Sequence, residues 1–146
     1  MNNILIINGP NLNLLGEREQ SQYGSTTFDE LKEMCLKKSK ELNIKLDFKQ
    51  SNIEGEIVNM IQEARKVNDG IIINAAGFTH TSVAIRDALS IYKKPKIELH
   101  ISNIHNREEF RQISVISPVC IEQVIGFGKD SYIKGLKLLL KYLVAL

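Results

Sequence analysis

The sequence has few features that would indicate a nucleic-acid partner or a disulfide-rich scaffold. Its 146 residues include two cysteines, no tryptophan and only 6% aromatic residues. Nineteen basic residues against 17 acidic ones leave a net charge of +2, which is too small to predict a nucleic-acid-binding surface. Without interleaved aromatic and basic residues, the chain also offers no platform on which bases could stack. We therefore expect no nucleic acid as a partner.

Long hydrophobic runs and paired cysteines are also absent. Cys35 and Cys120 lie far apart without C-x-x-C spacing, so we expect buried free thiols and neither a disulfide nor a zinc site. The apolar run of residues 4–7 is too short for a signal-peptide core or a membrane span, and no basic segment precedes it. We expect a cytoplasmic protein without membrane association.

The composition that remains is typical of one globular domain. Apolar residues make up 43% of the chain and charged residues 25%, close to the averages for soluble domains. A chain of this length usually forms one hydrophobic core, and no linker, repeat or low-complexity segment divides it. We expect a single catalytic or binding domain over residues 1–146.

Short β-branched runs alternate with amphipathic stretches, which is typical of βαβ units with a parallel sheet covered on both faces. Capping-box sequences at residues 27–30 and 51–54 predict two helix starts; a third helix follows Thr81, and a fourth covers about residues 131–146. The pattern predicts an α/β, flavodoxin-like three-layer sandwich with a five-stranded parallel sheet of order 2-1-3-4-5. The predicted strands are residues 4–7, 44–48, 70–73, 96–99 and 119–125.

A ligand site is expected at the carboxyl edge of this sheet, near the point between the first and third strands where the strand order reverses. The loop of residues 8–25 after the first strand is far longer than the roughly 2–6 residues usual in α/β units, which indicates a lid or binding loop. Asn74 ends the third strand and His100 ends the fourth. Polar residues of three strand ends are thus predicted to meet.

Several common sites lack their required residues. The chain has no phosphate-binding loop of the form G-x-x-x-x-G-K-[ST], and Gly126-Phe-Gly128 lacks the third glycine of a dinucleotide fingerprint. His80, His100 and His105 have neither the spacing nor the acidic partners of an H-E-x-x-H zinc motif. We expect no metal ion and no cofactor.

The remaining residues suit proton transfer next to a carbonyl group. Tyr23 could act as a general base only if its pKa fell from about 10 towards roughly 7 or 8, which requires about 3–4 kcal/mol. A guanidinium about 4 Å away supplies on the order of 4 kcal/mol at an effective dielectric near 20. Arg18, five residues earlier, could therefore nearly meet the requirement. The alternative is that Tyr23 covers the loop and Arg18 is solvated.

His100 is the candidate general acid, because imidazole exchanges protons near neutral pH and this residue ends a strand at the ligand edge. Glu98 lies two residues earlier, on the same face of the strand, and could orient the ring. The alternative is a structural histidine.

Groups that could bind an anion follow the same strand. The backbone amides of Ile101 and Ser102 could hold a carboxylate as a small nest, and Arg111 could add positive charge. Arg107 lies in a segment of charged residues with helical i,i+3 and i,i+4 spacing, so we expect its side chain to be solvated.

Five segments also occur in the order of a known family. They are Ile7-Asn-Gly-Pro-Asn-Leu-Asn-Leu-Leu-Gly-x-Arg-Glu19, Tyr23-Gly24, Asn74-Ala-Ala-Gly-Phe-Thr-His-Thr-Ser-Val-Ala-Ile-Arg-Asp-Ala-Leu89, Glu98-x-His-x-Ser-Asn-Ile-His105 and Arg107-Glu-Glu-Phe-Arg111. Together they resemble the type II 3-dehydroquinate dehydratases over most of the chain. The resemblance implies a flavodoxin-like fold and the loss of water from 3-dehydroquinate, through an enolate, to give 3-dehydroshikimate. It places the enzyme in the shikimate pathway to chorismate and the aromatic amino acids, and implies neither a metal nor a Schiff-base lysine.

The same resemblance implies catalytic roles at matching positions. Tyr23 would accept the proton, and Arg18 would lower the pKa of Tyr23 and stabilise the transition state. His100 would donate a proton to the departing hydroxyl group. Asn11 would position a water molecule or the enolate oxygen.

Substrate-binding roles and assembly follow from the resemblance as well. Asp87 would reach the site of a neighbouring subunit, because the family assembles as trimers grouped into homododecamers. The other substrate-binding groups would be Asn74, His80 and Arg111 on the hydroxyl groups and the amides of Ile101 and Ser102 on the carboxylate.

Two other functions stay open at this point. A non-catalytic module on the same fold would bind a small anion without forming the conjugated product. A flavin electron carrier would give a yellow protein.

Overall fold

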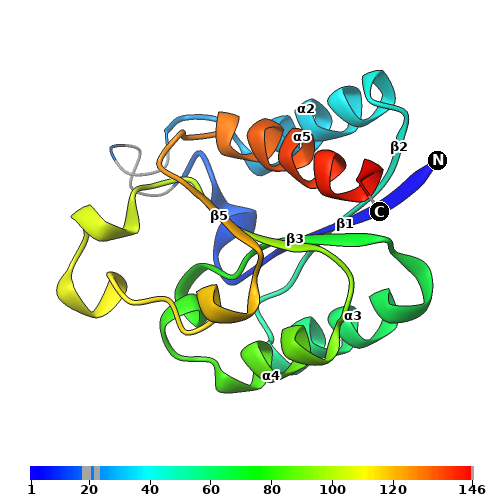
Figure 1. Ribbon diagram of the computed structural model, residues 1–146. Helices are drawn as coiled ribbons and strands as arrows, with labels where there is room; N and C mark the ends of the chain where they lie inside the picture. Colours follow the sequence, from blue (N-terminus) through cyan, green and yellow to red (C-terminus); the bar gives the residue numbers. More distant parts are fainter. Residues whose placement is uncertain (18–20, 22–23, 146) are drawn as a thin grey trace.

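The computed structural model describes residues 1–17, 21 and 24–145 (Figure 1). Five parallel strands form one sheet in the order β2-β1-β3-β4-β5, which confirms the predicted α/β fold and strand order. The strands are β1 (Asn2–Asn8), β2 (Ile44–Gln50), β3 (Gly70–Asn74), β4 (Lys96–His100) and β5 (Glu122–Ile125). The helices are α2 (Phe28–Glu41), α3 (Glu54–Val67), α4 (Val83–Ile91) and α5 (Asp130–Val144).

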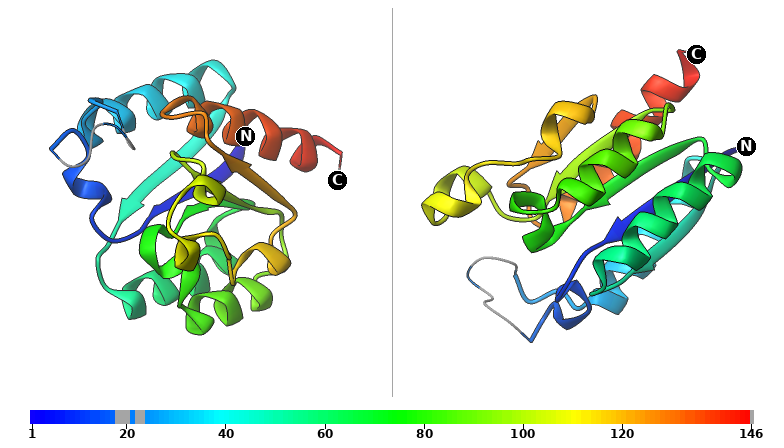
Figure 2. Two further views of the ribbon diagram at one scale, coloured as in Figure 1. Left: turned by 90° about the vertical axis from the view of Figure 1, so that its left-hand side faces the viewer. Right: turned by 90° about the horizontal axis from the view of Figure 1, so that it is seen from below.

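The helices cover both faces of the sheet, with α2 and α5 on one side and α3 and α4 on the other (Figures 1 and 2). Alternate residues of each strand point to opposite faces, so the sheet contributes to two apolar cores. Ile6 and Ile72 pack with Leu136 beneath α2 and α5. Ile7 and Ile73 belong to the core beneath α3 and α4. Burial on both faces explains the continuous aliphatic runs of the central strands.

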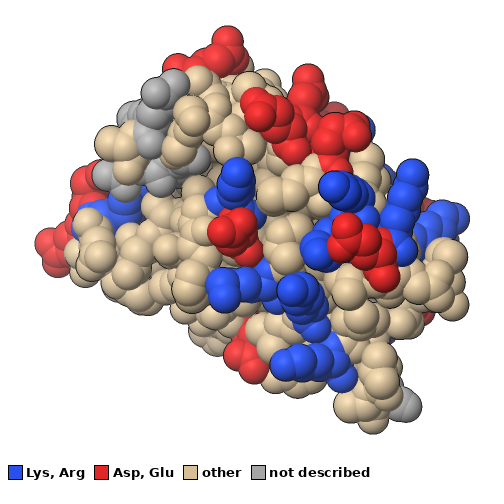
Figure 3. All heavy atoms as spheres, turned by 90° about the horizontal axis from the view of Figure 1, so that it is seen from above, with Lys and Arg blue, Asp and Glu red and all other residues tan. Residues whose placement is uncertain are grey.

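The outer surface of α2 and α5 carries charges of both signs (Figure 3). Leu136 and Leu139 of α5 are fully buried, whereas Lys137 and Lys141 are exposed, as the amphipathic pattern predicts. Among the helices of the described residues, none has the length and apolar character needed to cross a bilayer.

The capping box predicted at the start of α2 is confirmed. The Thr27 hydroxyl accepts a hydrogen bond from the Glu30 backbone N–H at 3.1 Å, and the Glu30 carboxylate accepts one from the Thr27 N–H at 3.3 Å. Each side chain thereby satisfies a backbone donor that the first turn leaves unpaired.

The capping box predicted at residues 51–54 is wrong. Helix α3 has Ile53 as its N-cap, without a capping side chain. The Ser51 hydroxyl instead accepts from the Ile53 N–H at 2.9 Å and donates to Glu56 at 2.5 Å. A serine hydroxyl that bonds a backbone group two residues later forms a local turn, which competes with helix capping.

The predicted start of the last strand is also wrong. Val119 belongs to the 3-10 turn Ser117–Val119, and β5 begins only at Glu122. Pro118 lies in the first turn of that short helix, where its fixed φ and missing N–H are tolerated.

The carboxyl ends of β1 and β3 lie close together at the reversal of strand order. Asn8 and Asn74 are register partners, and the Gly9 N–H donates to the Asn74 carbonyl oxygen at 2.8 Å. A Cβ atom at Gly9 would lie 2.4 Å from the Ala75 carbonyl oxygen, so this approach requires glycine.

Candidate active site

A pocket opens at the carboxyl edge of β1, β3 and β4, where sequence reasoning expected it. The structure brings seven of the predicted site residues to this pocket, from three loops that are distant in the sequence. They are Asn11, Asn74, His80, His100, Ile101, Ser102 and Arg111.

The other three predicted site residues have different outcomes. Arg18 and Tyr23 lie outside the described residues. Asp87 is exposed on α4 and is not part of the pocket wall of its own chain. Its expected role at the site of a neighbouring subunit stays a prediction.

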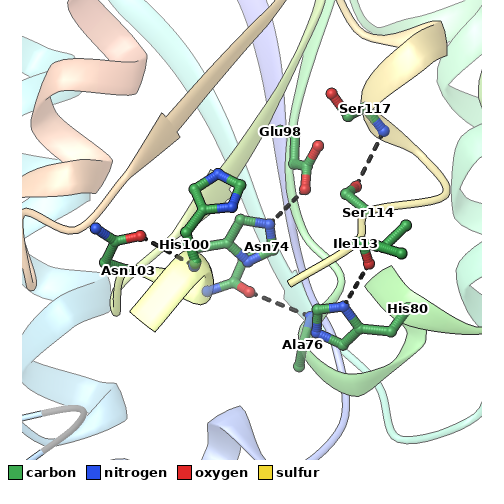
Figure 4. A network of polar contacts seen from close by, with 10 residues as sticks. Asn74, Ala76, His80, Glu98, His100, Asn103, Ile113, Ser114 and Ser117 are labelled. Atoms are coloured by element: carbon green, nitrogen blue, oxygen red, sulfur yellow. Dashed lines mark hydrogen bonds and ion pairs between the residues drawn. The ribbon is translucent and has the colours of Figure 1, made fainter. Parts of the chain in front are cut away.

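His100 and Glu98 form a buried pair at the end of β4. The His100 Nε2 atom lies 2.5 Å from the Glu98 Oε2 atom (Figure 4). The exposed fraction of His100 is 4% and that of Glu98 is 0%, so water does not screen this contact. The second oxygen of Glu98, Oε1, is buried and has no hydrogen-bond partner among the described residues. The carboxylate therefore orients the imidazole ring.

His80 lies on the turn that follows β3. Its Nδ1 atom is 2.8 Å from the Ile113 carbonyl oxygen, and because a carbonyl only accepts, Nδ1 carries the proton (Figure 4). Burial lowers the pKa of His80, and the electrostatic effects of the nearby His100 and Arg111 side chains lower it further. A neutral ring with Nδ1 protonated presents Nε2 as a hydrogen-bond acceptor, which suits a hydroxyl group.

The Asn74 side chain is held by two partners. Its Oδ1 atom accepts from the Ala76 N–H at 3.2 Å, and its Nδ2 atom donates to the Tyr132 hydroxyl at 3.1 Å. Ala76 has a positive φ of 52°, which a non-glycine residue rarely adopts, so the bond from Asn74 stabilises an unfavourable turn.

The prediction of a solvated Arg107 is wrong. Its side chain is only 9% exposed and lines the pocket, and Nη1 donates to the Ser102 hydroxyl at 3.3 Å. The segment forms two separate 3-10 turns, Ile104–Asn106 and Glu109–Arg111, where a helix was expected. The chain between them turns Arg107 inward. Arg107 is part of the segment of residues 107–111 that resembles the family, but the helical spacing of the charged residues in that segment indicated a solvent-facing side chain.

Arg111 is more exposed and shares its charge with an acidic neighbour. Its Nε atom lies 2.5 Å from a Glu108 carboxylate oxygen, and this hydrogen bond lowers the pKa of Glu108. Arg111 also lies over the Phe110 ring, 4.9 Å from its centroid. Arg107 is therefore the more buried positive charge in the described pocket.

Asn11 enters the pocket from the loop after β1. Its backbone has a left-handed φ of 70°, and its N–H donates to the Asn52 Oδ1 atom at 2.9 Å. Asn52 also accepts from Gln50 at 3.0 Å, so the end of β2 supports this loop. The pocket wall thus combines two imidazoles, two side-chain amides, one serine hydroxyl group and two guanidinium groups.

Metal-binding geometry is not found in the described part of the chain. No group of three or more His, Cys, Asp or Glu side chains there is arranged to hold a metal ion. The pocket is suited to an anionic, hydroxyl-bearing molecule, because it offers guanidinium groups, hydrogen-bond donors and a histidine acceptor.

The chain is similar to proteins of one family. The family model described as Dehydroquinase class II matches residues 2–140. A 3-dehydroquinate dehydratase of Fusobacterium nucleatum is 53% identical over 142 residues, which cover 95% of this chain and 97% of that protein. One of Caldicellulosiruptor saccharolyticus is 56% identical over 137 residues, covering 93% and 94%. The crystal structure of a type II dehydroquinase from Butyrivibrio crossotus has a TM-score of 0.93 at 48% identity and covers 94% of this chain and 97% of its own.

Proposed function

The chain belongs to the class II dehydroquinase family, and on this premise we propose that it removes water from 3-dehydroquinate to give 3-dehydroshikimate. This step belongs to the shikimate pathway, which leads to the aromatic amino acids. The observation that carries the proposal is the buried pair of His100 and Glu98 in a pocket that also contains Arg107. A protonated imidazole facing an anionic substrate is what the loss of a hydroxyl group requires.

Proton removal next to the substrate carbonyl is assigned to Tyr23. Its phenolate would take the proton, and Arg18 would favour the phenolate and stabilise the negative charge of the transition state. Both residues lie within the segment that the family model matches, which supports these roles. The electron pair of the broken C–H bond moves into an enolate, whose oxygen Asn11 would hold directly or through a water molecule.

Loss of the hydroxyl group is assigned to His100. The enolate electrons form the new C=C bond, the C–O bond breaks, and the hydroxyl leaves as water with the His100 proton. Glu98, whose Oε2 atom lies 2.5 Å from His100 Nε2, would orient the ring for this transfer. The proton held by Tyr23 then returns to His100 through solvent, so protons balance over one turnover and no cofactor is consumed.

Substrate binding uses the rest of the pocket. The amides of Ile101 and Ser102 would bind the carboxylate, and Arg107 would add the charge that holds it. His80 and Asn74 would bind hydroxyl groups, with Nε2 of His80 as an acceptor. Arg111 completes the positive side of the pocket.

We also propose that a second subunit contributes Asp87 and that the chain assembles as trimers grouped into homododecamers. Val83, Asp87 and Ile91 of α4 follow one another at four-residue spacing and therefore share one helix face. Val83 is 60% exposed and Ile91 54%, so this face exposes apolar surface around the carboxylate.

An absorbance assay tests the proposed reaction. Because 3-dehydroshikimate is a conjugated enone, purified protein mixed with 3-dehydroquinate should produce an ultraviolet absorbance that grows with enzyme concentration. Binding of 3-dehydroquinate without any absorbance would contradict the proposal and favour a binding module.

A further inference from the structure

We propose that Tyr132 of α5 is a positioning residue, whose buried hydroxyl group holds the Asn74 amide in the orientation that meets the substrate. The inference rests on the proposed function, in which Asn74 binds a substrate hydroxyl group. Tyr132 itself does not line the pocket.

Tyr132 stands at the centre of a buried chain of three polar side chains. Its hydroxyl accepts from Asn74 Nδ2 at 3.1 Å and donates to Asn8 Oδ1 at 2.6 Å. The exposed fractions are 0% for Tyr132 and Asn8 and 3% for Asn74. In such an environment, leaving one of these groups unpaired is costly, so each bond restrains its neighbours.

In this row of three side chains, the donor and the acceptor of each hydrogen bond are determined. Asn8 Nδ2 donates to the Lys49 carbonyl oxygen at 3.0 Å, which turns the Asn8 oxygen towards Tyr132. The Tyr132 hydroxyl must then donate to Asn8, and its lone pair faces Asn74. Burial raises the pKa of Tyr132, so the hydroxyl keeps its proton over the working pH range.

These bonds leave one hydrogen atom of the Asn74 amide free to donate to the substrate. The Asn74 oxygen is bound by the Ala76 N–H, and one Nδ2 hydrogen points to Tyr132. Because the amide is planar, the second Nδ2 hydrogen has a defined direction. Asn74 lines the pocket, so this remaining hydrogen is the one available to a bound hydroxyl group.

Tyr132→Phe tests the proposal, because it keeps the aromatic ring and removes only the hydroxyl group. We expect KM for 3-dehydroquinate to rise about 3- to 10-fold, the value of one hydrogen bond, while kcat changes less than about 2-fold. Tyr92→Phe is the matched control: Tyr92 is also 0% exposed, and its hydroxyl donates to the Asn68 carbonyl oxygen at 2.9 Å, away from the pocket. This variant should lose thermal stability without a change in KM.

A double variant separates positioning from a general structural role. If Tyr132 acts through Asn74, adding Tyr132→Phe to Asn74→Ala should raise KM no further. The proposal is overturned if KM of Tyr132→Phe equals that of Tyr92→Phe. It is also overturned if the increases in KM caused by Tyr132→Phe and by Asn74→Ala multiply in the double variant. An inactive wild-type protein would instead contradict the proposed function.

A second variant keeps the proposal testable should Tyr132→Phe not fold. Asn8→Ala removes the acceptor of the Tyr132 hydroxyl, one bond further from the pocket. It should raise KM in the same direction, and an unchanged KM in folded Asn8→Ala protein would overturn the proposal.

Discussion

At the scale of single residues, the buried contact between Glu98 and His100 is central to the proposed reaction. The His100 Nε2 atom and the Glu98 Oε2 atom are held 2.5 Å apart where almost no water reaches them. Such a contact is strong in a low-dielectric environment, and removal of one partner leaves the other buried without compensation.

His100→Ala should lower kcat by about 10²- to 10⁴-fold, the usual contribution of a general acid. His105→Ala is the control, because His105 is exposed and is not part of the pocket wall. Steady-state kinetics measure both, and circular dichroism checks the fold. Near-normal turnover of His100→Ala would contradict its assignment as the acid.

Arg107→Lys should raise KM by about 10-fold, since lysine keeps the charge but loses the forked donors that bind a carboxylate. Arg65→Lys, on the exposed end of α3, should have no effect. An Arg107→Lys variant with unchanged kinetics would mean that the inward-facing Arg107 side chain does not touch the substrate.

His80 should make stability depend on pH. Burial lowers its pKa in the folded state, so the unfolded chain binds the proton more readily. The free energy of unfolding should therefore fall as pH drops through the unfolded histidine value of about 6.5 towards the folded value. Urea unfolding at several pH values should show a shallower decline for His80→Gln than for the wild type, whereas His105→Gln should keep the wild-type decline.

At the scale of secondary structure elements, local sequence signals gave mixed results for physical reasons. The box at Thr27 forms, and the Thr27 and Glu30 side chains each accept a hydrogen bond from the other residue's backbone N–H. The similar sequence at Ser51 does not cap α3, because its hydroxyl is bonded to Ile53 and Glu56. The strand order and the two buried faces were predictable, since alternation of short aliphatic runs with amphipathic helices allows few topologies.

Thr27→Ala should destabilise the protein by about 1 kcal/mol, because it removes the acceptor for the Glu30 N–H. Thr26→Ala removes the neighbouring hydroxyl without touching the cap and serves as the control. Urea unfolding monitored by circular dichroism measures the difference. Equal stability of the two variants would mean that the capping box contributes nothing measurable.

At the scale of the whole molecule, the proposed assembly decides whether a subunit is active alone. Light scattering of the purified protein should give the mass of twelve chains. A monomer with full activity would contradict both the assembly and the role of Asp87.

The expected location in the cytoplasm stays a prediction.

Subunit mixing tests the shared site more directly. Asp87→Ala and His100→Ala should each be poorly active, but after unfolding and refolding together about a quarter of the sites would combine an intact His100 with an intact Asp87 from a neighbour. Recovered activity would support a shared site. No recovery in assembled mixtures would place Asp87 outside it.

The amino-acid sequence by itself determined the fold class, the sheet edge that holds the site, and seven residues of the pocket, because strand ends in a parallel sheet converge wherever the chain between them runs. Only the tertiary structure decided that Arg107 faces inward and that Tyr132 bonds Asn74, 58 positions away in the chain. These outcomes depend on how a turn is bent and on which element covers which strand end. Neither can be predicted from the spacing of residues along the chain.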